Sequence, residues 1–224
     1  FYPWPLSAIG GWQERLTLRR YREVPFWTAS SYTREHLEEQ GIESITQIPY
    51  GVNTQALDTL SKKELDEPLK LITVSRPAPN KQVDHAIAAL WCLLGEHEME
   101  AHLKIVGQGQ EEPALRRLVR ELEVEDHVEF CGALAEVEKD AALREAHFLL
   151  HTSLREGWGL NVIEANAMGT PAVVYPVGGL VDSTVHGQTG LVSEAETPES
   201  LAKTITGLAN DPKKYDMMRT EAWQ

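Results

Sequence analysis

The chain has few cysteines, no long apolar segment and no excess of positive charge, and each absence narrows what it can do. Cys92 and Cys131 are its only cysteines and lie far apart, so we expect two buried free thiols in a reducing compartment. No apolar run reaches the roughly 18–20 residues that span a bilayer. A formal net charge of -13 makes nucleic acid a poor partner. It still permits a local cationic pocket for one small phosphate ligand.

Several motifs of cofactor binding and catalysis are also missing. The segment GQGQEE from Gly107 breaks the dinucleotide fingerprint, because Glu112 stands where its last glycine belongs, and this argues against a nicotinamide enzyme. The sequence has no Walker loop, no Gly-x-Ser-x-Gly elbow, no Asp-x-Asp and no zinc spacing of cysteine and histidine. We therefore expect no metal and no bound cofactor, with Ser153 as a loop-capping residue and the eight histidines as structural or surface groups.

From Leu69 onward, short apolar runs alternate with segments of helical periodicity. Alternation of strands and helices is typical of βαβ units, so the pattern predicts an α/β domain with a doubly wound, Rossmann-like parallel sheet covered on both faces. Ligands of such sheets bind in loops beyond the carboxyl ends of the strands. The expected strands are LKLITVSR, HLKIVG, VEFCGA, HFLLHTS, PAVVYPV and TGLV, and the expected helices lie near 83–94, 115–122, 136–146, 160–168, 180–186 and 198–208.

The first sixty or so residues do not belong to this alternation. VPFWTAS is interpreted as a strand, TREHLEEQ as a helix that ends before Gly41, and ITQIP as a second strand. FYPWPLSAIGG, with two prolines and a Gly-Gly pair, is interpreted as a loop. One strand-helix-strand piece is too small for a core of its own. We therefore expect residues 1–58 to be the tail of a preceding domain and a linker, in a chain whose beginning is missing, since it starts without methionine.

The stretch REGWGLNVIEANAMGTPAVVYPVGG, Arg155 to Gly179, concentrates the candidate chemistry. It follows the fourth predicted strand of the domain, so it lies at the ligand edge. A helix that begins near Leu160 presents free N–H groups and a positive dipole end to a phosphate. Carboxylates repel such an anion, so Glu156 and Glu164 should face hydroxyl groups instead. A diphosphate between two sugars, as in a sugar nucleotide, satisfies both demands, with Glu164 on the ribose and Glu156 on the transferred sugar.

The spacing of these residues alone supports a simpler interpretation about equally well. Glu156 would be a solvated loop acid and Glu164 a favourable charge in the first helical turn. Arg76 and Lys81, in the loop after the first strand, could likewise be a surface pair, although their place at the ligand edge favours a functional role.

These motifs, taken in order, resemble retaining glycosyltransferases of family 4, which have the GT-B fold of two facing Rossmann-like domains. TVSRPAPNK resembles the first strand and loop of the family's donor domain, with Arg76 and Lys81 as the cations that bind the diphosphate. KIVGQG, FCGAL, LREGWGLNVIEANAMGTPAV and VGGLVDSTVHGQTGLV match the following motifs. VPFWTASSYTREHLEEQGI and IPYGVN resemble the end of the acceptor domain and its linker, so the resemblance covers essentially the whole chain.

The resemblance implies a donor-binding domain over residues 59–224, after a tail of the acceptor domain and linker over 1–58. Gln82, Trp158 and Asp182 depart from the family's usual glycine, phenylalanine and glutamate, and none removes a needed charge. A catalytic histidine in the missing acceptor domain cannot be placed on this chain. The implied catalytic residues are Arg76, Lys81 and Glu156, and the implied donor-binding residues are Gly107, Gly109, Gly132, Ala133, Leu134, Gly157, Trp158, Gly159, Leu160, Asn161, Val162, Glu164, Gly178 and Gly179.

The implied activity is retaining, metal-independent transfer of a hexose from a UDP-, GDP- or ADP-sugar to an acceptor that is a sugar, a lipid or a small molecule. The fragment alone is expected to be inactive or weakly active without the rest of its acceptor domain. A sugar-nucleotide epimerase of the same architecture and a non-catalytic sugar-nucleotide-binding protein remain alternatives. The expected location is cytoplasmic, and peripheral membrane association through the missing domain stays open.

Overall fold

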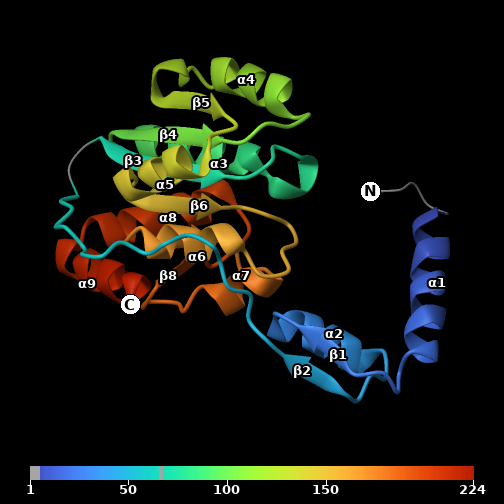
Figure 1. The fold of residues 1–224 in the computed structure, drawn as a ribbon. Coiled ribbons are helices and arrows are strands. Elements are labelled where there is room, and N and C mark those ends of the chain that lie inside the picture. The colour runs from blue at the N-terminus through green and yellow to red at the C-terminus, as the bar shows by residue number, and fades with distance from the viewer. Residues whose placement is uncertain (1–5, 66–67) are drawn as a thin grey trace. The chain divides into compact units, whose positions relative to one another are not determined.

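The computed structural model describes residues 6–65 and 68–224 (Figure 1). The chain divides into two compact units between Tyr50 and Gly51. The functional division expected at residues 58 and 59 stays a prediction. The second unit holds every residue predicted to bind the donor.

The first unit has the strand-helix-strand order that its sequence predicts. Strand β1 (Phe26–Thr28) pairs in parallel with β2 (Ile45–Gln47), and helix α2 (Ser31–Glu39) connects them. The hydroxyl of Ser30 caps α2 by accepting a hydrogen bond from the Thr33 backbone N–H, and Gly41 follows the helix with a φ of 84°. A glycine suits this left-handed position because it has no Cβ.

The prediction that FYPWPLSAIGG forms a loop is wrong for the residues that the structure describes. Residues Leu6–Arg20 form helix α1. Both prolines precede Leu6, so neither interrupts the helix, and a proline is tolerated at the start of a helix. The residues of α1 that follow the segment include several leucines and arginines, which favour helix strongly enough to carry it through Gly10 and Gly11. Residues 1–5 of the predicted loop lie outside the described residues.

The second unit is built on a six-stranded sheet whose paired strands all run in parallel, in the order β5-β4-β3-β6-β7-β8. This confirms the predicted doubly wound α/β architecture. The strands are β3 (Leu69–Val74), β4 (Ala101–Val106), β5 (Val128–Gly132), β6 (Phe148–His151), β7 (Ala172–Val174) and β8 (Gly190–Val192). The helices are η1 (Pro79–Lys81), α3 (Val83–Gly95), α4 (Glu112–Glu121), η2 (Glu125–His127), α5 (Glu136–Glu145), α6 (Leu160–Ala167), α7 (Gly178–Ser183), α8 (Pro198–Ala209) and α9 (Pro212–Trp223).

Helices cover both faces of this sheet. Helices α5 and α6 pack together on one face, and α3 packs on α4 and α8 on the other (Figure 1). The central strand β6 is buried at every position, as expected for a strand with helices above and below it. The chain order reverses between β3 and β6, so their carboxyl ends form the topological switch point where such sheets bind ligands.

Two details differ from the sequence expectations. Helix α9 was not predicted, although Asp211 caps it through the Lys214 N–H and Pro212 starts it; both are helix-start signals. Cys92 is a buried free thiol as expected, whereas Cys131 is free but only partly buried. Cys131 is more exposed than predicted because its strand, β5, lies at the edge of the sheet.

Candidate active site

The loop after β3 carries the predicted cations to the switch point. Arg76 is exposed there, and no ion-pair partner of Arg76 is found among the residues that the structure describes. Lys81 ends η1, and its backbone carbonyl and that of Gln82 accept hydrogen bonds from the Thr152 hydroxyl at 3.1 and 2.7 Å. Thr152 follows β6, so this contact fastens the lysine loop to the neighbouring strand.

The backbone conformation at Gln82 explains why the family usually has a glycine at this position. Its φ of 44° lies in the left-handed region, which a glycine adopts without strain and a residue with a Cβ adopts at a cost. The glutamine therefore keeps the backbone conformation that glycine favours, and its amide lies 3.2 Å from His85 Nε2. This contact with His85 helps to hold the loop behind Lys81.

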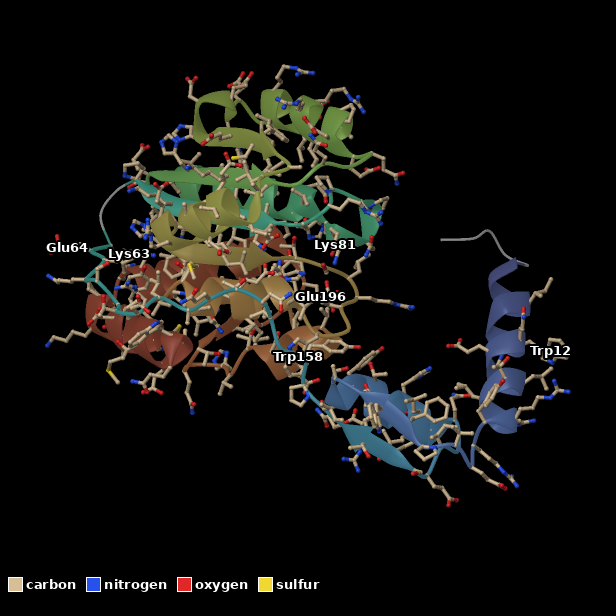
Figure 2. The ribbon with its side chains drawn as sticks, viewed as in Figure 1. Trp12, Lys63, Glu64, Lys81, Trp158 and Glu196 are labelled. Carbon is tan, nitrogen blue, oxygen red and sulfur yellow. The ribbon has the colours of Figure 1, made fainter. Side chains whose placement is uncertain are left out.

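Glu156, in the loop after β6, lies at the centre of the candidate site. Its Oε2 is 2.5 Å from Lys81 Nζ and 3.2 Å from His151 Nε2. His151 is 3% exposed, and its Nε2 also lies 2.9 Å from the Ser153 hydroxyl. Figure 2 labels Lys81, together with Trp158 from the same loop as Glu156. Segments that follow two different strands thus meet at one carboxylate.

The surroundings of Glu156 keep it ionised. Burial alone would raise the pKa of its carboxyl group, but hydrogen bonds from His151 and Lys81 outweigh burial and lower the pKa to about 2. A carboxylate that accepts hydrogen bonds from cationic or polar donors is stabilised in its charged form. Glu156 is therefore a negative acceptor of hydrogen bonds at neutral pH.

Glu164 occupies a second polar cluster, between α5 and α6. Its Oε1 lies 3.1 Å from Nζ of Lys139, which also lies 2.7 Å from Glu136 Oε2. Lys139 is a buried residue. Burial lowers its pKa, but hydrogen bonds to Glu136 and Glu164 outweigh burial and raise it. The hydroxyl contact of Glu164 stays a prediction; in the structure a buried lysine engages one of its oxygens.

The start of α6 leaves its first N–H groups without a capping side chain. Its N-cap is Gly159, with a φ of 84° and no side chain to accept from them. The N–H of Gly179 donates to the Glu156 carbonyl at 2.9 Å, and a Cβ at Gly179 would collide with the backbone of Gly157 and Trp158. A Cβ on Gly157 would instead meet open space. The loop thus packs tightly on α7 and leaves an open side at Gly157.

The other predicted donor-binding residues line the ends of neighbouring strands. Gly107 N–H donates to the Gly132 carbonyl at 2.7 Å, so the loops after β4 and β5 lie together. A Cβ at Gly107 or Gly109 would collide with the backbone of the β3 loop. Ala133 is exposed and Leu134 partly buried beside them.

Three predicted residues at the start of α6 differ in what they can offer. The Val162 side chain is wholly buried, so only its backbone could meet a ligand. The Asn161 amide donates to the Val74 carbonyl at 2.8 Å, which ties α6 to the end of β3. Leu160 is exposed, and Gly178 begins α7.

Two polar residues of the site were not singled out by sequence reasoning. His151 was taken with the other histidines as a structural or surface group, and Lys139 was not considered. The place of His151 in a strand directly before the two-glutamate stretch was a usable signal. Lys139 offered none, because its partner Glu164 lies on another helix.

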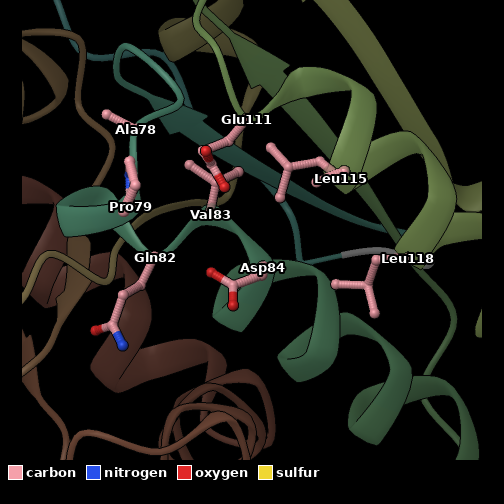
Figure 3. Close-up of a pocket in the computed structure, with 9 residues that line it drawn as sticks. Ala78, Pro79, Gln82, Val83, Asp84, Glu111, Leu115 and Leu118 are labelled. Carbon is pink, nitrogen blue, oxygen red and sulfur yellow. The ribbon is translucent and has the colours of Figure 1, made fainter.

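A cavity of about 360 Å³ lies beside this site between η1, α3 and α4 (Figure 3). Two acids, Asp84 and Glu111, line it with the apolar side chains of Val83, Leu115 and Leu118. Neither Lys81 nor Glu156 lines it. Its carboxylates would repel a diphosphate, so this cavity is a poor candidate for an anion site.

Among the described residues, no three His, Cys, Asp or Glu side chains are grouped closely enough to hold a metal ion. Within the same residues, no helix combines the length and apolar character that a membrane crossing requires.

The sheet order and the loops at its switch point define a Rossmann-like domain of the GT-B type. Solved structures share this fold. The Anabaena protein HepE, in complex with UDP and glucose, matches with a TM-score of 0.75 and 18% identity over 93% of this chain and 61% of that one. The pneumococcal O-GlcNAc transferase GtfA, in complex with UDP and GlcNAc, matches with a TM-score of 0.77 and 24% identity over 93% of this chain and 43% of that one.

The sequence family described as "Glycosyl transferases group 1" matches residues 58–224, and the chain belongs to this family. A glycogen synthase of Mycobacterium tuberculosis is 29% identical over 214 residues, which cover 90% of this chain and 51% of that protein. From the same organism, a GDP-mannose-dependent alpha-(1-6)-phosphatidylinositol monomannoside mannosyltransferase is 30% identical over 200 residues, 81% of this chain and 51% of that protein. An exopolysaccharide phosphotransferase of Streptomyces coelicolor is 31% identical over 213 residues, 92% of this chain and 22% of that protein. The chain thus spans about half the length, or less, of these relatives.

Proposed function

We propose that this chain is the donor-binding half of a retaining glycosyltransferase that takes its sugar from a nucleoside diphosphate. The observation that carries the proposal is the pairing of Lys81 with Glu156 at the switch point, beside an α6 start without a capping side chain. Membership of the group 1 family supports it. The names of the relatives differ in what is transferred, so donor sugar and acceptor are open to experiment.

The chemical task is to stabilise the nucleoside diphosphate as it leaves an oxocarbenium-like sugar. Negative charge grows on the leaving phosphate, and preorganised cations and N–H groups at that position lower the barrier. Lys81, Arg76 and the α6 N-terminus are the groups proposed for this role. Arg76 can fork across two phosphate oxygens, whereas Lys81 acts as a point charge. In this mechanism they do the work that a divalent metal does in other transferases.

Glu156 is proposed to accept hydrogen bonds from hydroxyls of the transferred sugar, and Glu164 from the ribose. A carboxylate has enough acceptor sites to keep its lysine and also bind a hydroxyl. The low pKa of Glu156, about 2, makes it a poor proton donor and a good acceptor at neutral pH. Glu156 therefore orients the sugar rather than protonating it.

Calorimetric titration of the chain with UDP, GDP, ADP and the matching nucleosides tests the proposal. We expect one diphosphate to bind at least tenfold more tightly than its nucleoside, because the diphosphate alone meets the cations. Equal affinity for a nucleoside and its diphosphate would contradict the site. An activity assay on a longer chain, one that includes a complete acceptor domain, then distinguishes the possible reactions. A transferase gives a glycoside only with an acceptor, an epimerase changes the sugar without one, and a binding protein turns over neither.

A further inference from the structure

Lys139 is a buried cation in a place where stability alone does not require one. Its side chain is 11% exposed and emerges from α5, which follows the segment Gly132–Leu134 at the end of β5. Its neighbours Ala142 and Leu143 on the same helix are buried apolar residues. Replacing a buried ion pair by well-packed apolar side chains is commonly neutral or stabilising, so such a pair is weak evidence of a stabilising role.

The two acids that Lys139 contacts differ in exposure. The side chain of Glu136 is 79% exposed, whereas that of Glu164 is 19% exposed. Glu136 is therefore a solvated partner on the same helix, and Glu164 is the partner that reaches from another element. The pair joins α5 to α6, two helices that pack side by side. Both start at the carboxyl edge of the sheet, after β5 and β6.

The contact with Lys139 involves one carboxylate oxygen of Glu164 and does not involve the other. Oε1 lies 3.1 Å from Lys139 Nζ, and no hydrogen bond to Oε2 is found within the described part of the chain. A carboxylate held by one oxygen has lost most of its rotational freedom before a ligand arrives, so less entropy is lost on binding. A hydroxyl that approaches Oε2 would meet an acceptor already in place.

We propose that Lys139 is a positioning residue for the ribose: it holds Oε1 of Glu164 so that Oε2 is directed at the ribose hydroxyls of the donor. This inference rests on the proposed function, because it takes Glu164 as the residue that binds the ribose. Lys139 itself does not touch the sugar. It joins the helix that follows the Gly132–Leu134 segment, predicted to bind the donor, to the acid that binds the ribose.

The test compares a nucleoside diphosphate with its 2′,3′-dideoxy form, using whichever of UDP, GDP or ADP the chain binds. The ratio of the two dissociation constants measures how well the protein binds the ribose hydroxyls. We expect the unaltered chain to prefer the ribose form by about tenfold or more. Lys139→Met should bring this ratio to within about twofold of one, mainly by weakening the ribose form. Glu164→Ala should do the same, and combining the two changes should add no further loss.

Matched variants separate positioning from a general loss of structure. Glu136→Gln removes the exposed partner of the same lysine and should leave the ratio unchanged. Lys139→Arg keeps the charge and should retain most of the preference. Thermal melting confirms that each variant folds, and Lys139→Gln takes the place of Lys139→Met if the latter does not fold.

The outcomes that overturn the inference are distinct from failure of the proposed function. An unchanged or larger ratio in Lys139→Met, with Glu164→Ala lowering it, shows that Glu164 binds the ribose without help from Lys139. A ratio near one in the unaltered chain removes Glu164 from the ribose and overturns the inference with it. Failure of every diphosphate to bind contradicts the proposed function itself.

Discussion

Nζ of Lys81 lies 2.5 Å from Oε2 of Glu156, although one residue follows β3 and the other follows β6. The two strands are neighbours at the point where the sheet order reverses. In the proposed reaction, an arriving diphosphate would share the Lys81 ammonium with the Glu156 carboxylate. Binding of the phosphate and placement of the carboxylate are therefore coupled.

Removing the Lys81 ammonium should weaken diphosphate binding far more than nucleoside binding. Hydrogen bonds between charged groups contribute about 1.5–3 kcal/mol, so Lys81→Ala should cost roughly tenfold or more in diphosphate affinity. Arg76→Ala should act in the same direction. Calorimetry with UDP, GDP or ADP and the corresponding nucleoside measures both affinities.

Lys213→Ala is the matched control for Lys81→Ala, because Lys213 is an exposed lysine of α9. It should leave both affinities unchanged. Equal losses for nucleoside and diphosphate in Lys81→Ala would show that this cation does not meet the phosphates.

Glu156 and Glu164 should act on different sugars. Glu164→Ala should weaken a nucleoside diphosphate and its sugar conjugate by similar factors, because both carry the ribose. Glu156→Ala should spare the diphosphate and remove only the affinity that the transferred sugar adds. Each lost set of hydrogen bonds should cost on the order of 1–3 kcal/mol.

Titration of both variants with both ligands measures this division, after melting curves confirm that each is folded. Indistinguishable profiles for the two variants would refute it. Unaltered affinities in both would make Glu156 a loop acid and Glu164 a favourable charge in the first turns of α6.

The ionised state of Glu156 should stabilise the fold above about pH 4.5 and cease to do so in acid. Its pKa is about 2 in the folded chain, against an ordinary value of 4.5. Between these values the unfolded chain binds more protons, so the contribution falls as the pH falls from 4.5 to 2. The full difference corresponds to at most about 3 kcal/mol, which solvent screening reduces at this partly exposed side chain. Denaturant titration across this range should show a shallower acid decline in Glu156→Gln, and equal slopes would contradict the low pKa.

Lys63 should make the stability of the fold rise with pH above neutrality. Burial, followed by the charge of Arg219, lowers its pKa from 10.5 to about 7. Nζ donates to the Ala146 carbonyl at 2.6 Å and the Thr170 hydroxyl at 3.0 Å. Between pH 7 and 10.5 the unfolded chain retains a proton that the folded chain has lost, so the free energy of unfolding increases with pH, by at most about 1.4 kcal/mol per unit.

Urea titrations at pH 6 to 9 test this dependence, with Lys63→Met compared at each pH. The variant should lose the rise that Lys63 contributes, so the difference between the two proteins should change steadily above pH 7. A constant difference would show that Lys63 keeps an ordinary pKa in the folded chain.

The sequence by itself determined the six strands of the second unit, most of its helices, and which loops share an edge. Alternation of apolar runs and helical stripes is a local property, and parallel strands bring all their carboxyl ends to one side. Lys81 and Glu156 could therefore be assigned to one site before their distance was known. The α1 helix was missed for a local reason as well, since the prolines and glycines near its start were given more weight than the helix formers that follow.

Only the tertiary structure decided which side chains meet. The contact of Lys139 with Glu164 depends on how α5 and α6 are rotated about their axes and how far each side chain reaches. The contact of His151 with Glu156 depends on the path of the loop after β6. No spacing in the chain records these orientations, because they follow from packing between elements that are distant in sequence. The site's loops are thus set by local pattern, and its charge pairs by the way the helices and loops pack on the sheet.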